Sequence, residues 1–127
     1  MDERTKWLTL AGQAMSGELR IEPGVGEAIR KAAKQYAEDL EILVGEAQRL
    51  GYLSGWGGLD SAKLLRVKFE QKAVGGGDDP TDNAVSRLQE HIAIAWLQHD
   101  TFAAAIGKLE MVDEERAAAI RAAAQGI

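Results

Sequence analysis

The two histidines, His91 and His99, are the residues whose imidazole nitrogens could bind a metal ion. Their spacing places them about 80° apart around a helix, so the i, i+4 histidine pair of a zinc-binding helix is absent. His99 falls on the apolar stripe of a predicted helix, and His91 lies beside that stripe. We therefore interpret both histidines as packing or partly exposed residues, and we predict no metal and no other cofactor.

Three aspartates, Asp78, Asp79 and Asp82, could supply carboxylate ligands to calcium. They lack the order of a calcium loop, in which spaced acids are followed by glycine and glutamate. Helix capping accounts for them instead, with Asp79 as the N-cap and Pro80 at the first helical position. Residues 75–77 are all glycine, but no Lys-Ser or Lys-Thr follows as in a phosphate-binding loop.

Catalytic chemistry has no readable motif in this chain. There is no cysteine, which excludes a thiolate nucleophile, a disulfide and cysteine-bound zinc. The serines lack a histidine–acid arrangement, and no apolar pocket is predicted that would perturb paired carboxylates. The net charge of −5 opposes binding to phosphate backbones. The sequence predicts a non-enzymatic protein that does not bind nucleic acid.

The elements that would position these residues are helices. Apolar residues recur at helical spacing and no strand pattern is present, so we predict an all-α fold. We expect one domain over 1–127, an elongated antiparallel helical hairpin with a short N-terminal helix and an interrupted second arm, assembling as a four-helix-type bundle. The predicted elements are a short helix at 3–16, a first arm at 24–51, a turn at 52–59, a helix at 60–74, a Gly/Asp loop at 75–80 and a long C-terminal helix at 81–124.

The predicted helix at 60–74 has a start signal and a charged face. Asp60 is the expected N-cap, with Leu59 and Leu64 as a hydrophobic staple around it. Its cations form either a solvated face or a docking patch, and they are Lys63, Arg66, Lys68 and Lys72.

Trp56 is followed by Gly57 and Gly58 in the predicted turn. Chain reversal needs the positive φ that glycine supplies, and four glycines offer such places: Gly51, Gly55, Gly57 and Gly58. An indole in a solvated turn would expose more apolar surface than a turn needs. Trp56 is therefore expected to pack onto its own helices or onto a partner.

Two helices lying side by side bury only one stripe of each other, which leaves apolar residues in need of another layer. Either the N-terminal helix with Trp7 covers them, or a second protein does. The interface candidates are Tyr36, Leu40, Leu43, Phe69, Ile92, Trp96 and Phe102. The candidates for a second face are Ile42, Val44, Leu64, Val67, Ile94, Trp96 and Leu97.

The order of long helix, Trp-x-Gly turn and second helical arm resembles the WXG family of small helical-hairpin proteins exported by type VII (ESX) secretion systems. Trp56 and Gly58 fall on the motif residues, and the segment 59–69 resembles related actinobacterial ESX-associated proteins. The resemblance spans about residues 21–120. It implies an antiparallel four-helix bundle formed by a homodimer, or by a heterodimer with another WXG-like protein, and contact with the secretion machinery.

Family members often carry a Tyr-x-x-x-Asp/Glu export signal beyond the second arm. Here Leu109 occupies the tyrosine position and Asp113 matches, which is a degenerate signal. The resemblance implies a protein that is cytoplasmic before export and is then secreted without a signal peptide. The missing tyrosine suggests that a signal-bearing partner is required.

The alternative is a cytoplasmic helical adaptor or chaperone-like binding module that is not exported. The first ten residues do not read as a secretory signal, because acids precede the first cation and polar residues interrupt the apolar run. No apolar stretch is long enough to cross a bilayer, so no membrane span is predicted.

Overall fold

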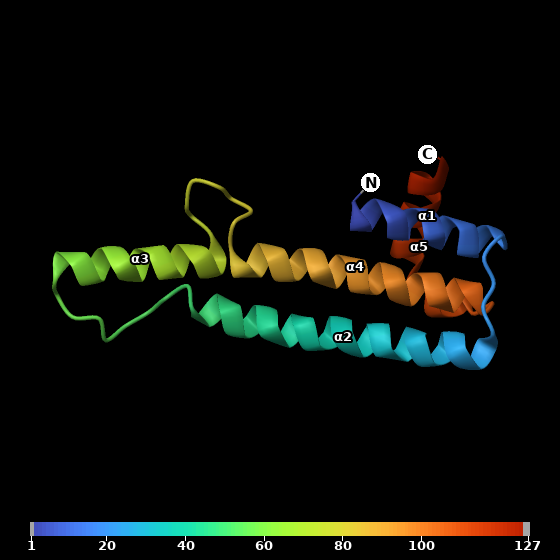
Figure 1. Ribbon diagram of the computed structural model, residues 1–127, viewed down its shortest axis with the longest axis horizontal. Helices are drawn as coiled ribbons and strands as arrows, with labels where there is room; N and C mark the ends of the chain where they lie inside the picture. Colours follow the sequence, from blue (N-terminus) through green and yellow to red (C-terminus); the bar gives the residue numbers. More distant parts are fainter. Residues whose placement is uncertain (1, 126–127) are drawn as a thin grey trace. The chain divides into compact units, whose positions relative to one another are not determined.

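The computed structural model describes residues 2–125, and those residues form helices and no strands (Figure 1). The all-α prediction is confirmed. The helices are α1 (Glu3–Ser16), α2 (Pro23–Arg49), α3 (Asp60–Val74), α4 (Ala84–Ala105) and α5 (Glu114–Gln125), with a 3₁₀ turn, η1 (Leu109–Met111), between the last two.

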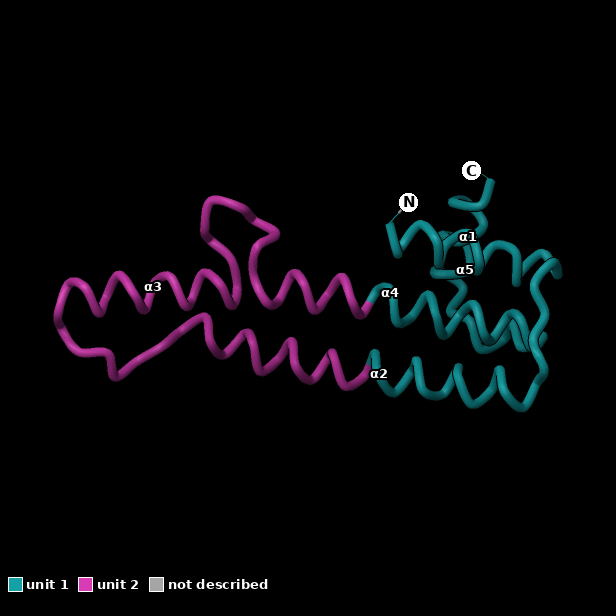
Figure 2. The backbone as a smooth tube through the Cα atoms, viewed as in Figure 1, with its two compact units in different colours: residues 1–37, 93–127 teal, residues 38–92 magenta. Residues whose placement is uncertain are grey.

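The chain divides into two compact units (Figure 2). Unit 1 comprises residues 1–37 and 93–127, and unit 2 comprises residues 38–92. The boundary falls inside α2 and inside α4, so each of these helices contributes a segment to both units. None of the described helices is both long and apolar enough to cross a membrane.

The prediction of one long helix over 81–124 is wrong at its start. Helix α4 begins at Ala84 because Asn83 is its cap: Asn83 Oδ1 accepts a hydrogen bond from the Ser86 N–H at 2.9 Å. Asp79, the expected cap, instead accepts from the N–H and the hydroxyl of Thr81 in a preceding turn. Those two bonds lower the pKa of Asp79, since they favour the charged carboxylate.

The same prediction is also wrong in its continuity. Helix α4 ends at Ala105, and Gly107 follows with φ of 80°. The N–H groups of Gly107 and Lys108 then bond to the carbonyls of Ala104 and Ala103, which satisfies the end of the helix. Helix α5 starts afresh, because Asp113 Oδ1 accepts from the N–H groups of Glu115 and Arg116. The apolar spacing continues through this break, which is why sequence periodicity did not reveal it.

Helix α3 has the predicted bounds but a different first turn. Leu59 occupies the N-cap position without a side-chain hydrogen bond, so the prediction that Asp60 is the cap is wrong. Asp60 is instead in the first turn, where the helix dipole favours a carboxylate.

Unit 1 closes its core with small residues. Its buried clusters centre on Ala11, Leu97 and Ile120, on Ala14, Ala104 and Ala105, and on Ala103, Val112 and Ala117. Trp7 and Met15 of α1 pack against these clusters, and the rings of Trp7 and Phe102 are 6.1 Å apart. Helices α1 and α5 contact each other directly. The N-terminal helix therefore serves as a covering layer for this unit.

Unit 2 holds the end of α2, the Trp56 turn, α3, the following loop and the first residues of α4. Its buried residues are few, and they are Leu40, Ala47, Ala73 and Asn83. Figure 2 shows α3 extending beyond the end of the α2 segment, with the turn running back along α3 and the first residues of α4 beside the α2 segment. Among the described residues, the three buried apolar clusters all belong to unit 1.

Candidate interaction surface

The Trp56 turn packs against α3. The rings of Trp56 and Phe69 lie 5.7 Å apart, tilted by 40°. Leu50 and Leu53 complete a shallow pocket with them, of about 250 Å³. Because all four side chains are apolar, the pocket suits one large apolar side chain rather than a charged ligand. Trp56 thus contacts its own helix while leaving an apolar recess open.

Backbone and carboxylate contacts fix the turn onto α3. The N–H of Leu53 donates to Glu70 Oε2 at 2.7 Å, and Arg66 Nε lies 3.7 Å from Glu70 Oε1. Positive φ occurs at Gly55 (83°) and Gly57 (78°), and Gly58 is not among the positive-φ glycines. Of the four glycines offered by the sequence, Gly55 and Gly57 therefore hold the left-handed conformation that an L side chain resists, and Gly51 and Gly58 do not.

We define the Trp56 face as Leu43, Leu50, Leu53, Trp56, Leu65 and Phe69. Leu43 lies on α2, and Leu50 directly follows its last residue, Arg49. Leu65 and Phe69 are four residues apart on α3, so they share a helix face. Leu50 and Phe69 line the same pocket, which joins the two pairs into one surface. These four side chains are 45%, 50%, 48% and 52% exposed, in the order Leu43, Leu50, Leu65, Phe69. Patches of exposed apolar residues are a feature from which interaction sites are proposed.

The predicted interface residues fall into separate groups. Leu43 and Phe69 belong to the Trp56 face, whereas Leu40 is buried. Ile92 lies partly buried at the end of unit 2. Tyr36, Trp96 and Phe102 are in unit 1, where Phe102 packs on Trp7.

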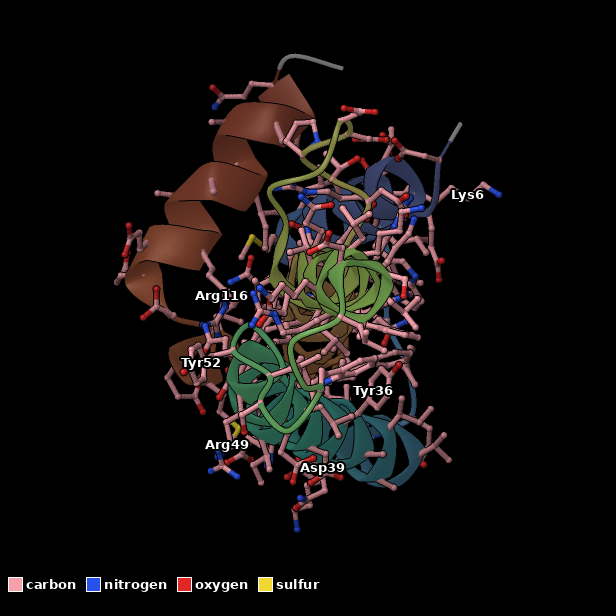
Figure 3. The ribbon with its side chains drawn as sticks, turned by 90° about the vertical axis from the view of Figure 1, so that its left-hand side faces the viewer. Lys6, Tyr36, Asp39, Arg49, Tyr52 and Arg116 are labelled. Carbon is pink, nitrogen blue, oxygen red and sulfur yellow. The ribbon has the colours of Figure 1, made fainter. Side chains whose placement is uncertain are left out.

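The second-face candidates divide in a similar way. Ile42, Leu64 and Val67 are exposed in unit 2, Val44 and Ile94 are partly buried, and Leu97 is in the unit 1 core. Tyr52, beside the turn, is 83% exposed and extends away from the ribbon of unit 2 (Figure 3). Exposed apolar surface is thus concentrated in unit 2.

The charges around the Trp56 face differ between its two helices. The α2 segment over 38–49 contains four acids and one cation, whereas α3 contains four cations and two acids. Lys72 pairs with Asp82, and Arg66 faces Glu70. Lys63 and Lys68 are exposed and have no ion pair within residues 2–125. The docking-patch interpretation of α3 therefore has cations available for a partner.

Unit 1 contains an ionic cluster that the sequence did not reveal. The Nδ1–H of His99 donates to Asp100 Oδ1 at 2.8 Å, and Arg30 Nη1 donates to His99 Nε2 at 3.2 Å. Arg116 makes two bonds to Asp100, of 2.9 and 3.2 Å. Glu27 receives two bonds from Arg30. This cluster, Glu27, Arg30, His99, Asp100 and Arg116, ties α2, α4 and α5 together, and we call it the ionic clamp.

The ionic clamp is arranged for structure rather than for catalysis. A histidine oriented by a buried carboxylate can serve as a general base, but here the second ring nitrogen accepts from Arg30. The neighbouring Thr101 hydroxyl donates to the Leu97 carbonyl at 2.7 Å. The Arg116 guanidinium also lies 4.6 Å from the centre of the Trp96 ring, which adds a cation–π contact. Its residues are distant in the sequence, and only the adjacency of His99 and Asp100 hinted at a pair.

The remaining candidate positions are structural in character. In the described part of the chain, no group of three or more His, Cys, Asp and Glu side chains could hold a metal ion. His99 is buried, in agreement with the packing interpretation, and His91 is exposed. Leu109 begins η1 and is 42% exposed, while Asp113 caps α5. The segment predicted to be a degenerate export signal therefore spans the break between α4 and α5.

Comparisons of the chain with models of protein families, with curated proteins and with solved structures found no match.

Proposed function

We propose that this chain is a non-enzymatic WXG-like protein of a type VII (ESX) secretion system, acting as an exported substrate or as half of a co-exported dimer. One observation carries the proposal: the Trp-x-Gly turn places Trp56 against Phe69 and leaves a half-exposed apolar face on the two helices that it joins. A turn with that composition and that surface is suited to pairing with another helical protein.

The energetics of unit 2 support a partner. Its large apolar side chains remain substantially in water, where each exposed 100 Å² of apolar surface forgoes about 2.5 kcal/mol of burial free energy. Association can recover part of that free energy. A partner with two helices would cover the Trp56 face and complete a bundle of helices there.

The position of Leu109 bears on how export would occur. Because Leu109 is partly exposed at the start of η1, it is accessible to another protein, but it lacks the phenol of the family's signal. A partner that carries a complete signal would supply the missing tyrosine. This form of the proposal makes secretion of the chain depend on the partner.

Secretion is the direct test. The tagged chain is expressed in a host with an active type VII system and in a matched strain in which that system is inactivated, each with and without a co-expressed WXG-like partner. We expect to find the chain in the culture filtrate of the active strain and not in that of the inactivated strain. The amount of secreted chain should be higher when the partner is co-expressed. Retention in the cell lysate, while the same strain exports its other substrates, would contradict the proposal.

Substitutions of Leu109 make the secretion test more specific. Leu109→Tyr restores the tyrosine at a partly exposed position, so we expect higher secretion of the chain in the absence of a partner. Leu109→Phe is the matched control, because it adds an aromatic ring of similar size without the hydroxyl. Equal secretion of the wild type and both variants would show that this segment is not read as a signal.

The alternative function is a cytoplasmic adaptor or chaperone-like module. The segment 109–113 favours this alternative, because it departs from the family's export signal: Leu109 lacks the tyrosine hydroxyl, and Asp113 already caps α5. Co-purification separates the two functions. A small WXG-like partner supports the secretion proposal, and a larger unrelated client supports the adaptor.

A further inference from the structure

We infer that a pocket beside the ionic clamp binds a small zwitterion of the amino-acid class, with the ligand's carboxylate at Arg116 and Lys34 and its ammonium group at Glu110. The pocket has a volume of about 520 Å³, and all of its lining residues belong to unit 1. The inference goes beyond the proposed function, because that function rests on the Trp56 face of unit 2.

The buried part of the pocket wall is made by Arg30 and His99 of the ionic clamp, which are 5% and 2% exposed. Glu27 accepts hydrogen bonds from Nε and Nη2 of Arg30, and Arg30 Nη1 donates to His99 Nε2 at 3.2 Å. These bonds fix both side chains before a ligand enters. The wall is therefore preorganised, which reduces the entropy that binding has to overcome.

Arg116 provides unused hydrogen-bond donors at this wall. It reaches from α5 to Asp100 of α4 (Figure 3), where its Nε and Nη2 donate at 2.9 and 3.2 Å. The Trp96 ring centre, 4.6 Å from the guanidinium carbon, supports the same group. Within residues 2–125, Nη1 has no hydrogen-bond partner, and it is not buried. Since a guanidinium carries five N–H groups in a planar fork, the edge formed by Nη1 and Nη2 can bind a second carboxylate.

Lys34 brings a second cation to the same pocket from α2. Its side chain is exposed, and the ion pairs of the described residues do not include it. A carboxylate between Lys34 and Arg116 would accept charge-assisted hydrogen bonds from two elements of unit 1. The cationic side of the pocket is therefore suited to a carboxylate.

Two acids on the pocket wall restrict the ligand further. Glu110 and Asp113 line the pocket, and Glu110 is exposed and makes no ion pair within residues 2–125. Because Asp100 and Glu27 already neutralise the two arginines, these acids would repel a simple anion, and a dianion such as phosphate most strongly. An ammonium group on the ligand turns that repulsion into attraction. A molecule that carries both groups matches both sides of the pocket.

The remaining wall is apolar. Trp96, Met111 and Val112 line the pocket, and Met111 is 39% exposed. An apolar or aromatic ligand side chain can pack on the indole and on the thioether. Pockets of several hundred Å³ with an apolar wall and a few convergent polar groups are typical of small-molecule sites. Phenylalanine is therefore a suitable probe.

Binding is measured by NMR on the full chain labelled with ¹⁵N. The chain has three tryptophans and so three indole N–H signals, and the spectrum of Trp96→Phe identifies the signal of Trp96. We expect L-phenylalanine to shift that signal with a Kd of about 1 mM, the strength usual for a ligand of this size. The signals of Trp7 and Trp56 should not move. No shift of the Trp96 signal up to about 20 mM phenylalanine would overturn the inference.

Three other probes test the chemistry of the ligand. Phenylalaninamide lacks the carboxylate, and N-acetylphenylalanine lacks the ammonium group, so each should bind about tenfold more weakly than phenylalanine. Inorganic phosphate should not shift the Trp96 signal. Equal binding of the amide would contradict the contact with Arg116 and Lys34. Equal binding of the N-acetyl compound, which resembles the end of a peptide, or of phosphate would show that the pocket does not select a free amino acid.

Substitutions at exposed positions test the two charged sides without disturbing the ionic clamp. Lys34→Gln and Glu110→Gln should each weaken phenylalanine binding by about threefold, as expected for the loss of one exposed ionic contact. Lys31→Gln and Glu18→Gln are the matched controls, at exposed positions of unit 1 that do not line the pocket, and they should leave the Kd unchanged. Circular dichroism checks that all four variants remain helical. Unchanged binding in both pocket variants would overturn the inference.

Discussion

Unit 1 and unit 2 share segments of α2 and α4, but they differ in how far their apolar side chains are buried. Unit 1 covers its core with α1 and α5, uses alanine for close helix contact and adds the ionic clamp. Unit 2 leaves Leu, Phe and Tyr side chains largely in water. The difference teaches that forming helices does not by itself bury their large apolar side chains: unit 1 buries such residues in three clusters, and unit 2 leaves most of them exposed.

The ionic clamp gives the largest expected effect. Asp100 is fully buried and receives bonds from His99 and Arg116. Asp100→Ala leaves a buried imidazole N–H and a guanidinium without their acceptor, which should lower the free energy of unfolding by about 3–5 kcal/mol. Chemical denaturation measures it. Asp78→Ala, at an exposed position of unit 2, should change stability by less than about 0.5 kcal/mol. Equal effects of the two variants would contradict the structural role of the clamp.

Truncation of a large apolar side chain to alanine should lower the stability more in unit 1 than in unit 2. Ile120 is 1% exposed in unit 1, and Ile120→Ala should cost about 2–5 kcal/mol because it creates a cavity. Leu65→Ala, in the Trp56 face, should cost the isolated chain less than about 1 kcal/mol, since its side chain is half in water. Thermal unfolding at low protein concentration measures both. A large loss for Leu65→Ala under those conditions would show that unit 2 has a core of its own.

Two glycines in α2 extend the comparison to the backbone. A Cβ at Gly26, in unit 1, would come within 2.2 Å of Ile106 Cγ2, so Gly26→Ala should destabilise the fold by about 1–3 kcal/mol. A Cβ at Gly45, in unit 2, would meet no atom within 4 Å. Gly45→Ala should therefore stabilise by about 0.5–1 kcal/mol, through helix propensity. The prediction fails if both substitutions shift the melting temperature in the same direction.

The Trp56 turn offers a smaller effect within unit 2. Gly57 has φ of 78° and Gly58 does not have positive φ, while neither would bring a Cβ within 4 Å of another atom. Gly57→Ala should cost about 1 kcal/mol from backbone strain alone, and Gly58→Ala should be close to neutral. Urea denaturation of the pair measures the difference. A larger loss of stability for Gly58→Ala than for Gly57→Ala would contradict the assignment of the left-handed conformation to Gly57.

Helix periodicity allowed the all-α class and the bounds of α1 and α3 to be predicted, because those signals are local. The break between α4 and α5 could not be predicted, since apolar spacing continues across Gly107 and a single glycine does not reveal its φ. Asn83 was overlooked as a cap because Asp79 and Pro80 form the same kind of signal four residues earlier.

The functional residues show the same limit. Trp56 could be identified from its type and its place in a turn, but its contact with Phe69 and the exposure of Leu43 depend on tertiary packing. The ionic clamp joins residues from three helices that are far apart in the chain, so no local pattern contains it. Sequence reasoning therefore located the turn and missed the polar core of unit 1.

The smallest expected effect is the response of unit 1 to acid. In unit 1, hydrogen bonds from Arg30 lower the pKa of Glu27 from 4.5 to about 2. Because the folded-state value is depressed, the stabilisation is complete above about pH 4.5 and is lost as the pH falls through about 2. Glu27→Gln should therefore flatten the acid end of a stability profile recorded between pH 6 and about 1.5. Glu18→Gln, at an exposed position of the same unit, should leave the profile unchanged. A wild-type profile already flat over this range would show that the Arg30 contact contributes no pH-dependent stability.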